Sequence, residues 1–132
     1  MRRALAAGSA AAVVSGVPST LHALATGRDP LEATLAAGSL LLPHETRRVR
    51  LVTAALPVHL ALSLGWAVLL ARLLPRRPSP LTGAAAGLVI AAVDLGVVGR
   101  CVPRVRALAP VPQVADHLVY GATVALVLRR LG

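Results

Sequence analysis

The stretch LTGAAAGLVIAAVDLGVVG, residues 81–99, contains a single charged side chain, that of Asp94. A helix needs about 20 mainly apolar residues to cross the hydrocarbon of a bilayer, so this run is typical of a transmembrane helix. Gly83, Gly87 and Ala91 recur every fourth residue, a spacing that places small side chains on one helix face. At 100° per residue Asp94 falls about 20° from Gly83. We therefore expect this face to pack against another helix, with the acid turned into the bundle.

Three other stretches share this character, so the sequence predicts four spans, near residues 4–27, 51–74, 81–99 and 111–131. Hydrophobic residues make up 56% of the chain and charged residues 14%, and the mean hydropathy is +0.74. These values exclude an intrinsically disordered chain, a disulfide scaffold and a soluble globular domain. The predicted fold class is all-α, an integral membrane bundle that forms a single transmembrane domain over residues 1–132.

The first two arginines and the apolar run after them resemble a signal peptide, but the run is longer than a usual signal core and three further spans follow. We expect it to be retained as a span. After it, Asp29 is expected as a helix N-cap, with Pro30 in the first turn and Glu32 three residues after the cap. The apolar part before Pro43 is too short to cross alone. We expect a short interfacial or re-entrant helix at about residues 30–42, with a thin fifth span as the alternative.

All fourteen basic residues are arginines, and the net charge is +9. They form short groups between apolar runs without interleaved aromatic residues, which favours contact with the lipid bilayer and excludes a nucleic-acid partner. One side of the predicted bundle carries Arg2, Arg3, Arg72, Arg76, Arg77, Arg129 and Arg130, and the other carries Arg28, Arg47, Arg48, Arg50, Arg100, Arg104 and Arg106. The positive-inside rule is therefore tied. The two arginines of the short N-terminal tail favour cytoplasmic termini in a bacterial inner membrane.

Ionisable side chains inside the predicted spans gather toward one membrane surface. At a rise of 1.5 Å per residue, both acids lie roughly 7 Å from that surface, as does the histidine of the first span, and the histidine of the second span lies about 12 Å deep. The predicted intramembrane polar cluster is His22, His59, Asp94, Asp116 and His117. Small and polar residues share one stripe on each other span: Gly8, Ala12, Ser15, Ser19, His22 and Thr26; His59, Ser63 and Trp66; Gln113, Asp116, Tyr120 and Thr123.

A charge facing lipid at the centre of a helix costs roughly 2.5–3.5 kcal/mol on insertion scales, so such groups normally face inward and pair. We expect Asp94 to pair with His59 or His117, and Asp116 also to meet Arg100 or Arg104 near the surface. Pro57 and Pro18 are expected to leave the carbonyls of Thr53 and Val14 without helical donors. The two aromatic residues, Trp66 and Tyr120, are expected to serve in packing or at the membrane interface.

The strings GVPSTLH (residues 16–22), DPLE (29–32) and PQVADH (112–117) resemble small uncharacterised multi-span membrane proteins of high-GC actinobacteria. The resemblance covers most of the chain and implies no activity. It favours an ordered chain around Pro18 and a specific role for the adjacent Asp116 and His117.

Three functions remain from these patterns. The first is a structural or accessory membrane protein whose polar cluster fixes helix register and which packs with a second copy or a larger membrane complex. The alternative is a small proton-coupled or ion-conducting transporter, and the third is a haem- or metal-binding membrane subunit. No nucleophile elbow, phosphate-binding glycine loop, zinc-peptidase motif or catalytic carboxylate pair is present, so we expect no enzyme. Neither a cofactor nor a metal site is expected, because the histidines lack short-range ligand spacing.

Overall fold

The computed structural model describes all residues from Met1 to Gly132 and contains helices but no strand. Four helical stretches are long and apolar enough to cross a membrane: Arg2–Ala25, Arg48–Leu73, Pro80–Cys101 and Pro110–Leu131. The all-α class and the number of apolar spans therefore agree with the sequence prediction. In chain order the elements are α1 (Arg2–Val14), α2 (Val17–Ala25), α3 (Glu32–Leu41), α4 (Arg48–Leu73), α5 (Pro80–Gly96), η1 (Val98–Cys101), α6 (Pro103–Arg106) and α7 (Pro110–Leu131).

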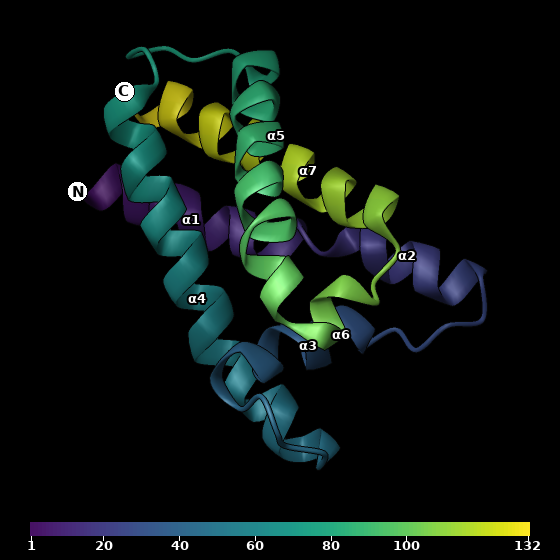
Figure 1. Ribbon diagram of the computed structural model, residues 1–132. Helices are drawn as coiled ribbons and strands as arrows, with labels where there is room; N and C mark the ends of the chain where they lie inside the picture. The colour runs from purple at the N-terminus through teal and green to yellow at the C-terminus, as the bar shows by residue number, and fades with distance from the viewer.

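Helix α7 is the central element of the bundle. It packs against α5 and against α1 and α2, while α4 packs along α1 and α3 packs along α4 (Figure 1). Of the apolar stretch of α7, 39% is buried, against 22% for α5, which is the most peripheral span. The core is rich in alanine, because short side chains let these helices approach closely: Ala7, Ala11, Ala67, Leu70, Ile90, Tyr120, Val124 and Leu128.

Glycines allow the backbones of α5 and α7 to come into contact. A Cβ atom on Gly83 would overlap the carbonyl oxygen of Gly121, and one on Gly87 would overlap the carbonyl oxygen of His117. Ala91 continues the same face and is also buried. This small-residue face is therefore covered by α7 of the same chain. On α7, the glycine that packs against this face is Gly121, which the sequence analysis did not identify.

The first span is not one continuous helix. The helical hydrogen bonding of α1 ends where the amide of Ser15 donates to Ala11, and that of α2 begins where Thr20 donates to Gly16. Pro18 explains the interruption, because it lacks the amide hydrogen that would bond to the carbonyl of Val14. Near the start of α2, however, proline is tolerated. The expected span at residues 4–27 thus consists of two helices in sequence.

The short helix after the first span begins at Glu32, and α3 is not among the helices long enough to span. The expected N-cap at Asp29 is wrong: Leu31 occupies that position, and the Asp29 carboxylate accepts the amide of Leu31 at 2.9 Å instead. Asp29 also binds Arg48 at the start of α4, an interaction that sequence spacing alone does not reveal. Further along, α3 packs so closely on α4 that a Cβ on Gly38 would overlap the carbonyl of Leu51.

The remaining boundaries differ from the predicted ones by a few residues. Helix α4 starts at Arg48, before the expected residue 51, and Pro57 lies inside it without ending it. The segment between α5 and α7 contains the short helices η1 and α6. Helix α5 is capped by the hydroxyl of Ser79, which accepts the amide of Thr82 at 3.0 Å.

Candidate functional site

Asp116 and His117 are adjacent on α7 and contact two different helices, α2 and α5. Successive side chains on a helix diverge by 100°, so adjacent residues reach different elements. The Asp116 carboxylate accepts the backbone amide of Ser19 in α2 at 2.9 Å. The His117 ring lies against α5, with its Nε2 atom 3.4 Å from Oδ2 of Asp94. Through these two residues, α7 joins the first span to the third.

Asp94 connects three spans. Its Oδ2 atom accepts the indole N–H of Trp66 at 3.2 Å and faces Nε2 of His117. Trp66 belongs to α4, Asp94 to α5 and His117 to α7. Only 22% of the Asp94 side chain and 19% of the His117 side chain are exposed. Trp66, expected only as a packing or interface aromatic, is therefore also the hydrogen-bond donor that ties α4 to the acid.

The His117 ring contacts a backbone carbonyl through Nδ1 and the Asp94 carboxylate through Nε2. Its Nδ1 atom is 2.7 Å from the carbonyl oxygen of Gln113, and a carbonyl only accepts, so Nδ1 carries a hydrogen. If the ring were neutral, Nε2 would direct a lone pair at the Asp94 carboxylate. That contact is favourable only when one further proton is present, on the imidazole or on the carboxyl group. His117 Nε2 and the Asp94 carboxylate therefore form an ion pair when the imidazole is protonated.

The interruption between α1 and α2 is bracketed by two ionisable side chains. His59 of α4 donates its Nε2–H to the carbonyl oxygen of Ala12, in the last turn of α1, at 2.8 Å. On the other side, the carboxylate of Asp116 accepts the amide of Ser19 in the first turn of α2. Helix ends leave such backbone groups without intrahelical partners, and an acid at an N-terminus and an imidazole at a C-terminus complement the helix dipoles. The break is thus capped from both neighbours.

Not every expected partner is present. Of the two pairings open to Asp94, the structure contains the one with His117 and not the one with His59. Asp116 makes no ion pair with Arg100 or Arg104 and bonds to backbone instead. His22 is partly buried and its side chain makes no hydrogen bond, although its carbonyl accepts Thr26 Oγ1 at 2.7 Å. Four of the five predicted cluster residues are therefore engaged with neighbouring spans.

Several contributors were not assigned their roles from sequence. The hydroxyl of Tyr120 donates to the carbonyl of Ser63, joining α7 to α4. Both residues lie on the polar stripes of their helices, and that common stripe is the signal that points to the contact. Pro18 was expected to free the carbonyl of Val14, whereas the carbonyl held by a side chain is that of Ala12. The Nε2 atom of Gln113 is buried without a partner.

No three histidine, cysteine or acidic side chains are grouped so that they would hold a metal ion. The cluster divides into the Asp94–His117 pair and the two caps of the broken span. What these side chains do in the structure is make hydrogen bonds and one close histidine–carboxylate contact between neighbouring helices.

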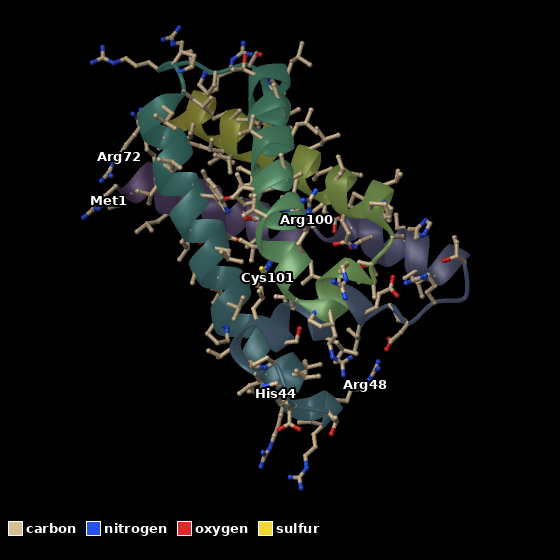
Figure 2. The ribbon with its side chains drawn as sticks, viewed as in Figure 1. Met1, His44, Arg48, Arg72, Arg100 and Cys101 are labelled. Carbon is tan, nitrogen blue, oxygen red and sulfur yellow. The ribbon has the colours of Figure 1, made fainter.

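Ion pairs outside the spans fasten the segment that carries α3. Arg48, at the start of α4, holds the pKa of the Asp29 carboxyl at about 2, and Figure 2 shows this arginine at the lower end of the molecule. The pKa of Glu45 is also lowered, first by the backbone amide of Arg47 and then by Arg50, which lies 3.1 Å away. A third pair joins Arg28 and Glu32 at 2.9 Å. Three of the fourteen arginines are thereby paired with carboxylates.

No protein-family model, curated protein or solved structure matches the chain. What the site does must therefore follow from its geometry.

Proposed function

We propose that this chain is a multi-pass integral protein of the bacterial inner membrane with a structural or accessory role and no enzymatic activity. Four apolar helices support the membrane placement. The outward residues of the peripheral helix α5 are aliphatic and strongly exposed: Leu81, Leu88 and Val89. A contiguous apolar surface of this kind is stable in lipid or against another protein and unfavourable in water.

The observation that carries the structural role is the use of His59 and Asp116 as caps. Each contacts one end of the interruption between α1 and α2. An unpaired backbone group away from water costs about 1–3 kcal/mol, so these contacts fix the register of the first span against α4 and α7. At the break, both side chains bond to backbone groups of the same chain. The bundle that they hold then offers the outer face of α5 to a second copy or to a larger membrane complex.

The test compares two histidines. His59→Ala removes the side chain that caps α1. His22→Ala removes a histidine side chain that makes no hydrogen bond. In detergent, we expect the first substitution to lower the free energy of unfolding by about 1–3 kcal/mol and the second to change it by less than about 0.5 kcal/mol. Equal stabilities of the two variants would contradict the capping role.

The contact between the ionisable side chains of Asp94 and His117 favours a second candidate, a small proton-coupled or ion-conducting transporter. Interrupted membrane helices also form the binding sites of many transporters. Vesicles reconstituted with the wild-type chain and loaded with a pH-sensitive dye separate the two functions. Proton flux that disappears in a folded Asp94→Asn variant would establish transport. Absence of flux from the wild type, with a destabilised Asp94→Asn variant, would support the structural role.

A further inference from the structure

A small cavity lies at the end of the bundle where α1 begins and α4 ends. Its volume is about 150 Å³, and three arginines from different segments line it: Arg3, Arg72 and Arg76. Leu74 and Leu128 form an apolar part of the wall. Figure 2 shows Arg72 at the end of α4 that lies toward Met1. The cavity is therefore lined by both arginine and aliphatic residues.

No carboxylate neutralises these arginines. Arg3, Arg72 and Arg76 take part in none of the ion pairs or side-chain hydrogen bonds of the protein. The backbone of Gly132 lies beside the Arg3 guanidinium, but the chain terminus forms no ion pair with it. The five acidic residues of the chain are all elsewhere: Asp94 and Asp116 in the polar cluster, and Asp29, Glu32 and Glu45 paired at the opposite end.

The cavity end and the opposite end of the bundle differ in how their arginines are paired. At the opposite end, three arginines have carboxylate partners. Arg3, Arg72 and Arg76, which line the cavity, have no carboxylate within ion-pair distance. Arginines without carboxylate partners produce a positive potential that attracts an anion.

The position of Arg3 adds a second reason to expect an anion. It lies in the first turn of α1, which contains no acidic residue and has no side-chain cap. The first amides of a helix lack intrahelical acceptors, and the N-terminal end of the helix dipole is positive. A cation is unfavourable there, whereas an anion is favoured by both the amides and the dipole.

We infer that this cavity binds the phosphate group of an anionic phospholipid headgroup. Guanidinium groups match phosphate oxygens in two-point hydrogen bonds, and basic pockets between membrane helices suit such headgroups. The partly buried Leu74 gives the cavity an apolar edge that suits the acyl chains of the lipid. This inference rests on the proposed membrane placement, in which the helix ends lie at the membrane surface.

The test measures binding of short-chain phosphatidylglycerol, short-chain phosphatidylcholine and inorganic phosphate to the full chain in an uncharged detergent, by native mass spectrometry. Phosphatidylglycerol should bind at least tenfold more tightly than the other two, and more weakly as salt is added. Arg76→Gln and Arg72→Gln should each weaken its binding about tenfold. Arg129→Gln, at the same end but outside the cavity, should weaken it less than about twofold.

Equal losses for Arg76→Gln and Arg129→Gln would overturn the cavity as the site, because they would indicate a diffuse charge effect. Inorganic phosphate that binds as tightly as phosphatidylglycerol would overturn the lipid as its source. Thermal melting of each variant verifies folding, and Arg76→Lys, which keeps the charge but loses the planar fork, should give an intermediate affinity. A chain that inserts into phosphatidylcholine vesicles yet shows no preference for phosphatidylglycerol would refute this inference alone. A chain that fails to insert would refute the proposed function as well.

Discussion

The crossing of α5 and α7 leaves no room for a side chain at Gly87, and Gly87→Ala tests that packing. The added Cβ would overlap the carbonyl oxygen of His117, lie 2.9 Å from its carbonyl carbon and lie 3.3 Å from the Cα of Leu118. Ordinary van der Waals contacts of a Cβ are 3.4–4 Å long. Because the obstacle is backbone, it cannot rotate away, and the two helices must separate by about 1 Å.

That separation has two measurable effects. Overpacking of this kind costs about 1–3 kcal/mol. It also lengthens the 3.4 Å contact between Asp94 and His117, because the two residues sit on the helices that move apart. The matched control is Gly65→Ala in α4, where an added Cβ meets nothing within 4 Å. There the helix propensity of alanine should raise the free energy of unfolding by about 0.5–1 kcal/mol.

The assay is reversible unfolding of the purified chain in mixed micelles, followed by circular dichroism. The expected order of stability is Gly65→Ala above wild type and Gly87→Ala below it. A Gly87→Ala variant as stable as wild type would show that α5 and α7 are not in backbone contact at this crossing. The same result would remove the geometric basis for placing Asp94 beside His117.

Two further predictions concern single residues. Asp29 has a pKa of about 2 in the folded chain against an ordinary value of 3.8, so its pairing with Arg48 stabilises the fold fully above about pH 4 and loses that effect as the pH falls toward 2. The difference in Tm between wild type and Asp29→Asn should be constant above pH 4 and vanish near pH 2; a difference independent of pH would argue against the pair. Trp66 is the only tryptophan, and its indole N–H bonds to Asp94, so Asp94→Ala should move its fluorescence emission to shorter wavelength. Unchanged emission would indicate that this hydrogen bond is absent.

The predicted spans depend on local properties of the chain. An apolar run near 20 residues long satisfies its backbone hydrogen bonds by forming a helix, and this requirement acts before any helix meets another. The small-residue face of Gly83 and Gly87 also follows from spacing alone. The interruption near Pro18 is also local in origin, since proline cannot donate the backbone hydrogen bond that would continue α1 into α2.

The partners of the polar side chains depend on tertiary structure. The sequence places Asp94, His59 and His117 at related depths, but rotation and separation of neighbouring helices select which of them touch. That choice was made by backbone contacts such as the one between Gly87 and His117, which bring α5 onto α7 while His59 turns toward Ala12. Asp29 was similarly diverted from a local cap to Arg48, far along the chain. Hydropathy and spacing thus determined how many helices form and which of their faces are polar. Only close packing decided which polar side chains pair. The interaction energies of these pairs arise between helices, so no periodic pattern within a single helix predicts them.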